Sequence, residues 1–532
     1  MRRIFTRKEE WILGKTSSGK KMLFTAVFMA FATLLSKVLG LVRDSMLTAY
    51  FGSGLESDAF LTASTIPTQL FDVVIGGVIS ATFIPVFNDI MTKRNKDEAM
   101  KFVNKFITLI LIASIVISVL GIVFASPLVT LQAPSYELDK HILTQQLTAI
   151  MFPMIIFTGL AFSCVGLLQS FGEYNIPSVI SLVSNAAIIL YYVLFGKKFG
   201  VYGLAVTMVI AWSLQLIIQL PFLHKMGVRY RPDFHFKDPA IKQAALLAGP
   251  MLISTWVQPL YSLVNQRLAS NVPSAVTYIQ QSSRLYIIVT GVFSFVVTNL
   301  VFPKLSQAVA ANDKKEANSL IVTSLKSIFL VILPIMAVFM VAAEPIANVM
   351  YGHGKMSGEG VASIGNLLRL YSIGMLALAA NEVLSKAFFS MQDSKPPMRN
   401  SIVSMVVNIG LAYLLYRFMS TPGLALATVG GSVVNAVLNY ICMVRKHPGM
   451  FAKSDKVTIV KIVVCGIVMY AVMYFVFNLL SGRIDTSSII GSILTAGISG
   501  AVALIIYLAA CLVLRIDTVT DILKTLKGGK TA

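Results

Sequence analysis

Charged residues, cysteine and histidine are all scarce in this sequence. Only 13% of the 532 residues are charged, about half the share found in soluble domains, whereas 56% are hydrophobic. The four cysteines lie in apolar segments and the five histidines are scattered, mostly in loops, so neither set has the spacing of metal ligands. The composition excludes an ordinary soluble domain, and we expect no metal site.

The patterns that mark many enzymes are missing as well. The sequence has no glycine-rich phosphate loop, no redox-cofactor motif and no hydrolytic nucleophile with a partner base. We therefore expect no cofactor and no catalytic residue. An enzyme is the weaker interpretation of this chain.

Long apolar runs take up most of the chain. A transmembrane helix needs about 20 consecutive apolar residues, and the alternation typical of membrane strands does not occur. The predicted fold class is therefore an all-α polytopic membrane protein. We identify fourteen apolar segments, at about 22–50, 58–90, 104–126, 144–171, 177–196, 202–223, 240–268, 275–303, 320–343, 362–391, 398–418, 422–444, 457–479 and 488–514.

The net charge of +20 follows the predicted membrane topology. Basic residues gather before the first segment and in alternate loops, among them 93–105, 225–237 and 445–456. By the positive-inside rule these loops and both termini are cytoplasmic, so the charge does not indicate a nucleic-acid partner. Contact with anionic membrane lipids is expected as well. The opposite loops contain few basic residues: Lys140, Lys197, Lys198, Lys355, Arg417 and Arg483.

Two parts of the chain repeat one pattern. Ser178, Ser181 and Asn185 open the fifth segment, and the same spacing recurs in the eleventh, at Ser401, Ser404 and Asn408; Gly-Leu-Ala begins the next segment each time. Six segments separate the copies, which predicts two parallel six-helix halves around a central cavity, as in transporters. The predicted organisation is a cytoplasmic N-terminal segment (1–21), an N-terminal half (22–223), a cytoplasmic linker (224–239), a C-terminal half (240–444), two further helices (457–514) and a cytoplasmic tail (515–532).

Three basic residues lie inside predicted membrane helices. Lys37 and Arg43 are well within the first segment, and Arg284 is well within the eighth, which enters from the other side. Each costs roughly 2.5–3.5 kcal/mol at a helix centre unless it faces a water-filled cavity or a partner. Because the two helices belong to different halves, these cations predict a central cavity for an anion.

Structural alternatives exist for these charges. Lys37 and Asp44 lie on nearly the same helical face and could pair, and Arg43 could pair with Glu56 or Asp58. Asp58 could instead be a carboxylate near a helix start, where the helix dipole favours it. The further candidates for ligand contact are Asn265, Arg267, which could simply extend toward the membrane surface, and Asp72.

The opening segments resemble a known family. "SKVLGLVRD", "SDAF" and "FIPVF", followed later by "SSRLYIIVTGVFSFVVTNLVFPKLS" and "FFSMQDSKPP", are similar to the MurJ (MviN) family of lipid II flippases. That family belongs to the superfamily of multidrug, oligosaccharidyl-lipid and polysaccharide exporters. The resemblance implies that Lys37, Arg43, Asp58 and Arg284 are cavity residues that bind the substrate.

Some positions depart from the family pattern. Lys37 stands where family members usually have arginine, which keeps the charge but loses the two-pronged guanidinium. Phe71 and Ser283 replace an arginine and an acid that are usual in the family. Some members carry a sodium site beside the eleventh helix, but Ala412 follows Asn408 at the next turn here. Sodium coupling is therefore not predicted.

The function implied by the resemblance is translocation of lipid II, an undecaprenyl-pyrophosphate glycolipid, from the inner to the outer leaflet by alternating access. The bacterial cytoplasmic membrane is the expected location, and cell-wall synthesis proteins are the expected partners. The alternatives are a flippase for another undecaprenyl-linked glycan and a cation-coupled multidrug exporter. A membrane-embedded glycosyltransferase is the enzyme alternative.

Overall fold

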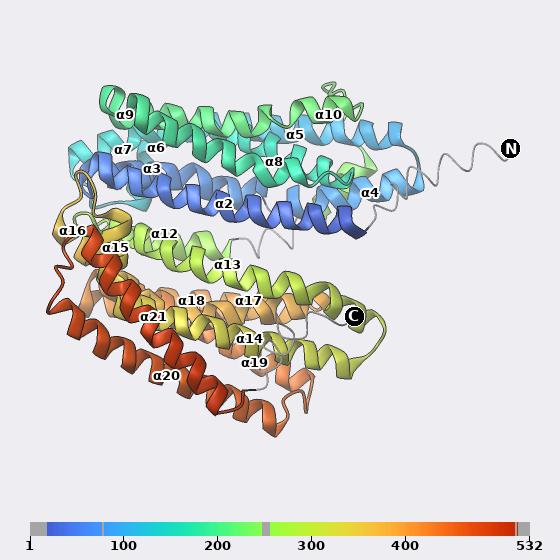
Figure 1. Ribbon diagram of the computed structural model, residues 1–532. Helices are drawn as coiled ribbons and strands as arrows, with labels where there is room; N and C mark the ends of the chain where they lie inside the picture. Colours follow the sequence, from blue (N-terminus) through green and yellow to red (C-terminus); the bar gives the residue numbers. More distant parts are fainter. Residues whose placement is uncertain (1–18, 77–78, 247–255, 517–518, 520–532) are drawn as a thin grey trace. The chain divides into compact units, whose positions relative to one another are not determined.

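The computed structural model describes residues 19–76, 79–246, 256–516 and 519. Most of the predicted N-terminal segment and tail therefore lie outside the described residues. In the described part every regular element is helical, as predicted (Figure 1). Up to the linker these elements are α2 (Gly19–Phe51), α3 (Leu55–Phe71), the π-helices η1 (Asp72–Gly76) and η2 (Ile79–Phe83), α4 (Ile84–Lys93), α5 (Lys96–Val123), α6 (Ala125–Gln132), α7 (Leu138–Met151), α8 (Met154–Ser170), α9 (Asn175–Ile217) and α10 (Leu220–Lys225).

The described helices after the linker continue the same pattern. They are α12 (Val257–Ala269), α13 (Ala275–Ala310), α14 (Lys314–Val341), α15 (Ala343–Tyr351), α16 (Gly358–Ser372), α17 (Met375–Ser390), α18 (Lys395–Met419), α19 (Thr421–Lys446), α20 (Lys453–Ser481) and α21 (Ile489–Val513). Each predicted apolar segment overlaps one of these helices or a run of them.

The helices are long and apolar enough for a multi-pass membrane protein. Nine helical stretches of the described residues could span a membrane, or ten when α16 and α17, bent by 47°, are taken as one. One of the nine, Asn175–Lys225, has 51 residues and would be roughly 75 Å long, more than twice the hydrocarbon thickness. It contains a non-helical break at Gly200, between two predicted segments. The total of fourteen spans and the repeat of the two halves stay predictions.

The chain folds into two compact units. The first comprises Met1–Arg43, Pro67–Val123 and Ala149–Leu252. The second comprises Asp44–Ile66, Phe124–Thr148 and Ile253–Ala532. The boundaries fall inside α2, α3 and α7, so these helices contribute residues to both units.

Aromatic packing holds the first unit together. The rings of Phe83 and Phe106 lie 5.0 Å apart, and Phe83 also packs on Phe87 at 5.9 Å, which joins η2, α4 and α5. Helix α8 packs against both α5 and α9. At Gly121 of α5 a β-carbon would overlap the ring of Phe152, so the close approach of these segments requires glycine.

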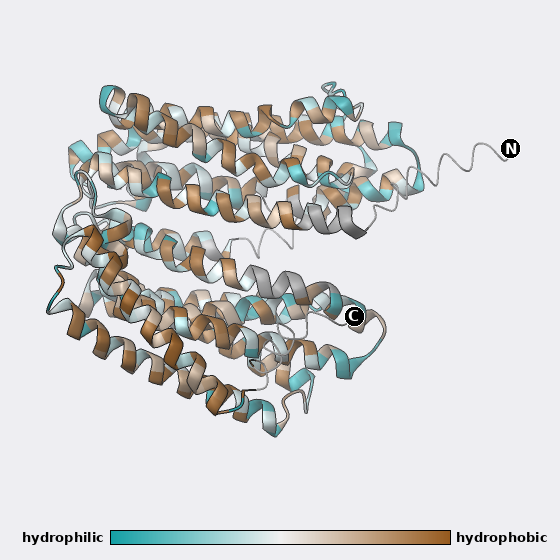
Figure 2. Cartoon of the chain, viewed as in Figure 1, coloured by the Kyte–Doolittle hydropathy of each residue, from teal (hydrophilic) through white to brown (hydrophobic). Residues whose placement is uncertain are grey.

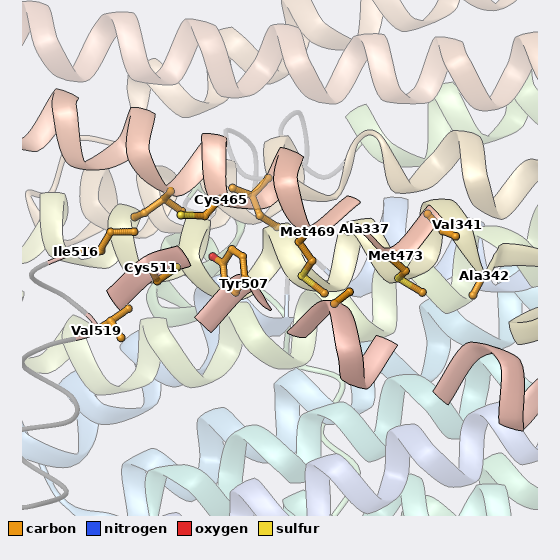
Figure 3. Packing of buried hydrophobic residues seen from close by; sticks show 13 residues of the cluster. Ala337, Val341, Ala342, Cys465, Met469, Met473, Tyr507, Cys511, Ile516 and Val519 are labelled. Atoms are coloured by element: carbon orange, nitrogen blue, oxygen red, sulfur yellow. The ribbon is translucent and has the colours of Figure 1, made fainter. Parts of the chain in front are cut away.

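In the second unit a buried cluster joins α14, α20 and α21 (Figure 3). Tyr507 is almost fully buried there, and its hydroxyl donates to the carbonyl of Leu330 over 2.8 Å, which satisfies the polar end of the ring. Cys465 and Cys511 lie in the same cluster. Both cysteines are therefore small residues of the apolar core.

Exposed apolar side chains cover much of the outer helix surface. On α20 and α21, Phe475 and Ile505 are 70% and 67% exposed. Figure 2 shows hydrophobic residues along most of both helices and hydrophilic ones mainly near helix ends. Such apolar surfaces fit the hydrocarbon of a bilayer, whereas the outer faces of helices in water are polar.

Candidate functional site

Arg43 is held by a neutral partner within the first unit. Its Nη1 donates to Oδ1 of Asn185 on α9 over 3.1 Å. The amide Nδ2 of Asn185 donates in turn to the carbonyl of Ser36, about two turns before Arg43 on α2, over 3.1 Å. Asn185 thereby joins α9 to α2 and orients the guanidinium. The pairing of Arg43 with Glu56 or Asp58 stays a prediction.

Lys37 is half-buried on the same helix. Within the described residues it forms no ion pair, so the alternative in which it pairs with Asp44 is wrong. A lysine in an apolar helix is costly to keep there without a partner or water. Lys37 therefore stays a candidate for an anionic ligand.

Asp58 is fully buried in the second unit, and its carboxylate makes three contacts. Its Oδ2 accepts from Nζ of Lys140 on α7 at 2.6 Å. Its Oδ1 accepts from the backbone N–H of Thr277 at 2.8 Å and from the Thr277 hydroxyl at 2.5 Å. Asp58 lies in the first turn of α3, as the structural alternative expects, but the backbone N–H group that its carboxylate caps belongs to α13.

This cap compensates for an unusual start of α13. Ser274 precedes the helix with φ of 61°, in the left-handed region, and its side chain caps no backbone group. The first N–H groups of a helix have no partner inside it, and a carboxylate there is favoured by the helix dipole. Asp58 therefore supplies the cap from α3, and Lys140 compensates the buried negative charge.

A chain of buried polar groups surrounds Asp58. The hydroxyl of Tyr136 hydrogen-bonds with that of Thr62 at 2.7 Å, Thr62 accepts from Gln266 at 3.1 Å, and Gln266 accepts from Gln132 at 2.5 Å. Nζ of Lys140 lies 4.2 Å from the centre of the Tyr136 ring. Burial raises the pKa of the Tyr136 hydroxyl, and the Asp58 carboxylate adds to this effect. The network holds α3, α6, α7 and α12 in fixed register.

Arg284 is anchored by Asp44 in the second unit. Arg284 Nη1 lies 2.5 Å from Asp44 Oδ1, and the side chains are 33% and 6% exposed. Gln281, one turn earlier on α13, donates to the Asp44 carbonyl over 3.2 Å. Because Arg284 follows Thr277 by two helical turns, α13 is tied to α3 at its start and to α2 further along. The sequence offered no acid near Arg284 on its own helix, and the partner comes from α2.

The remaining predicted residues have different surroundings. Asn265 Nδ2 donates to Thr428 of α19 over 3.3 Å, while its buried Oδ1 has no hydrogen-bond partner in the described part of the chain. Arg267 Nη1 donates to the carbonyl of Leu131 over 2.8 Å and so caps the end of α6. Asp72 is exposed at the start of η1 and has no ion pair with another described residue. Helix termination accounts for Arg267, so a ligand is not needed to explain it.

Comparison with known proteins identifies the family. The family model described as lipid II flippase MurJ matches residues 47–495, most of the chain. The chain belongs to the MurJ family. A "Probable lipid II flippase MurJ" of Buchnera aphidicola (subspecies Acyrthosiphon pisum, strain APS) is 25% identical over 460 residues, which cover 86% of this chain and 90% of the relative. The "Lipid II flippase MurJ" of Burkholderia cenocepacia is 27% identical over 418 residues, 77% and 81% of the two chains.

Solved structures share the fold of this MurJ family member. One described as "Lipid II flippase MurJ, inward closed conformation" has a TM-score of 0.77 at 21% identity and covers 91% of this chain and all of that one. An inward-facing multidrug resistance MATE family transporter has a TM-score of 0.64 at 14% identity over 79% of this chain and 99% of that one. At these identities the likeness establishes the fold alone.

The sequence did not identify four residues that hold the predicted ones. They are Asn185 for Arg43, Asp44 for Arg284, and Lys140 and Thr277 for Asp58. Their signal was indirect: an acid and a cation that share a membrane region usually pair. Lys140 is one of the few basic residues in the loops predicted to lie opposite the cytoplasm, and Asp44 is an acid inside the first predicted helix. Neither observation specifies which opposite charge pairs with Lys140 or with Asp44.

Within the described residues no group of three or more His, Cys, Asp or Glu side chains is arranged to hold a metal ion. The polar groups described above are instead amides, hydroxyls and paired charges. Such groups orient and bind a ligand by hydrogen bonds and charge.

Proposed function

We propose that this chain translocates lipid II from the inner to the outer leaflet of the bacterial cytoplasmic membrane. The membership of the MurJ family over residues 47–495 carries the proposal. The transporter fold and the cations inside apolar helices support it. In this proposal both termini are cytoplasmic, because the basic residues gather on that side.

Three cations are proposed to bind the pyrophosphate of the substrate: Lys37, Arg43 and Arg284. A guanidinium offers paired N–H groups that match phosphate oxygens, and charge-assisted hydrogen bonds are about twice as strong as neutral ones. Asn185 orients Arg43 without neutralising it. Asp44 fixes Arg284 and offsets part of its charge, so that release of the anion stays possible.

Asp58 is proposed to control the outer end of the pathway through its pairing with Lys140. This contact ties α3 to α7, and the bonds to Thr277 tie α3 to α13. Any motion that separates these helices must break a buried ion pair. The contact is thus suited to hold one state of an alternating-access cycle closed at this end.

The membrane potential is a sufficient source of energy for export. Moving about two negative charges to the positive outside gains roughly 4.6 kcal/mol per 100 mV. No nucleotide hydrolysis is required on this scale. We propose a transporter that catalyses no covalent step, with the enzymes of cell-wall synthesis as its partners.

The decisive experiment uses cells whose own lipid II flippase can be shut off. The wild-type chain should restore the lipid II accessible at the outer face, whereas Arg284→Ala and Arg43→Ala should lower it at least tenfold. Arg483→Ala removes an exposed loop arginine and serves as the matched control. Wild-type export by Arg284→Ala at equal membrane levels would remove that residue from the site.

The shared fold with MATE transporters keeps a multidrug exporter as the second candidate. A pocket for cationic drugs would need acidic or aromatic groups, whereas the candidate residues here include three cations. Uptake of organic cations into inverted vesicles decides between the two functions. Uptake of these cations that the Arg284→Ala variant performs at the wild-type rate would favour the drug exporter. The complementation experiment also tests the other glycans. If the chain restores another undecaprenyl-linked glycan at the outer face, but not lipid II, that glycan is the substrate.

A further inference from the structure

The first unit contains an apolar cavity away from the candidate site. It has a volume of about 640 Å³ and lies between α5, α8, α9 and α10, which are neighbours in Figure 1. Leu111 of α5, Leu160 and Leu167 of α8, and Leu216 and Leu220 of α9 and α10 form its walls. The volume is within the roughly 300–1,000 Å³ typical of small-molecule sites. The walls suit an apolar ligand.

The lining of this cavity also includes basic and polar residues. They are His224, Arg229 and Tyr230, from α10 and the loop after it. The Tyr230 hydroxyl hydrogen-bonds with Thr108 of α5 at 2.9 Å, and the backbone N–H of Arg231 donates to Asn104 over 3.1 Å. The loop is therefore fastened to α5 on the C-terminal side of Arg229. This places a cation beside the apolar walls of the cavity.

The cavity borders a surface that fits lipid. Ile217 and Leu220, which line it, are also 52% and 48% exposed, and apolar side chains exposed on a membrane helix face hydrocarbon. Arg229 belongs to the linker predicted to be cytoplasmic. The apolar walls thus adjoin acyl chains, and the linker position of Arg229 places its charge toward the level of the headgroups.

We propose that this cavity binds an anionic glycerophospholipid of the inner leaflet. One acyl chain occupies the space between the leucines, and the phosphodiester contacts Arg229 and His224. Basic pockets between membrane helices on the cytoplasmic side have the charge that complements such headgroups. Lys37 and Arg43 line no part of this cavity, so the lipid site is separate from the proposed substrate site.

The test measures lipid adducts of the purified full chain by native mass spectrometry. Phosphatidylglycerol and phosphatidylethanolamine are titrated separately at neutral pH. We expect wild type to prefer phosphatidylglycerol, and Arg229→Ala to weaken its binding roughly fivefold, the effect of one basic residue at a membrane surface. Arg231→Ala, an exposed neighbour that does not line the cavity, should keep wild-type binding.

A second pair of variants tests the apolar part. Leu220→Trp fills the cavity from an exposed position and should reduce binding of both lipids, whereas Leu194→Trp, 58% exposed elsewhere on α9, should not. Equal binding of the two lipids to wild type overturns the proposal. So does unchanged phosphatidylglycerol binding by Arg229→Ala, or an equal effect of the two tryptophans. Lipid II is not used, so the result is independent of the proposed function.

Discussion

The two compact units hold their embedded cations in different ways. In the second unit, cations meet carboxylates: Lys140 pairs with Asp58, and Arg284 with Asp44. In the first unit, Arg43 is oriented by the neutral amide of Asn185. A carboxylate offsets positive charge, whereas an amide leaves it in place.

This difference distinguishes residues that stabilise the fold from residues that bind the anionic substrate. Breaking a buried ion pair leaves an uncompensated charge and costs about 3–5 kcal/mol, whereas a hydrogen bond from a cation to a neutral amide contributes about 1.5–3 kcal/mol. We therefore expect substitutions at the carboxylates to reduce mainly stability. Substitution of Asn185 should reduce mainly the handling of the anionic substrate.

The largest effect is expected for Asp58→Ala. This change removes the cap of α13 and leaves Lys140, which is 14% exposed, without its carboxylate, so it should lower the free energy of unfolding by about 3–5 kcal/mol. Thermal unfolding in detergent with a thiol-reactive dye measures it. Asp58→Asn keeps an acceptor for the Thr277 N–H and should lose less. Equal losses for Ala and Asn would show that the cap contributes nothing.

A smaller loss is expected for Asp44→Ala. Arg284 is one-third exposed, so solvent screens part of its charge and the loss should be about 2 kcal/mol. The double variant Asp44→Ala with Arg284→Met should recover part of this loss, because no unpaired charge remains. The same thermal assay checks both. A double variant that is less stable than Asp44→Ala alone would contradict the ion-pair interpretation.

A substitution of Asn185 can give Arg43 the kind of partner that the cations of the second unit have. Asn185→Asp gives Arg43 a carboxylate and should leave stability within about 1 kcal/mol of wild type, while lipid II display falls severalfold because the positive charge is offset. Asn408→Asp is the matched control, since this repeat counterpart donates to the carbonyl of Ala427 rather than to an arginine. Unchanged display with Asn185→Asp would mean that the charge of Arg43 does not matter.

Much of the fold follows from the sequence because membrane insertion is a local property. A run of apolar residues must be helical in hydrocarbon whatever surrounds it, and each predicted segment overlaps a helix. Finer features depend on context. The predicted segment 58–90 is divided into α3, η1, η2 and α4, with Pro67 inside α3. Proline and packing against neighbours determine such breaks, and neither is visible as hydrophobic periodicity.

Charged residues inside the apolar helices could be recognised from the sequence, but their contacts could not. Lys37, Arg43, Asp58 and Arg284 were conspicuous because charge is costly in an apolar helix. Their partners come from distant parts of the chain: Asn185 for Arg43, and Lys140 with Thr277 for Asp58. Spacing along one helix suggested a pair of Lys37 with Asp44, but the Asp44 carboxylate pairs with Arg284. One-dimensional spacing does not distinguish between opposite charges that a helix could reach.

The smallest effect is expected for a charged pair that joins the start of an apolar span to the linker. Asp238 Oδ2 is 2.5 Å from Nζ of Lys105. Burial alone would raise the pKa of the Asp238 carboxyl, but the hydrogen bonds from Lys105 and from the Ala240 N–H lower it overall. A lowered carboxyl pKa contributes stability above its unfolded pKa of about 3.9, and this contribution is lost as the pH falls through the folded pKa. Asp238→Asn should therefore cost about 0.5–1 kcal/mol at pH 7 and nothing once both states are protonated. Melting curves of the two proteins that fail to converge in acid would contradict this account and would place the cost in the lost backbone contact instead.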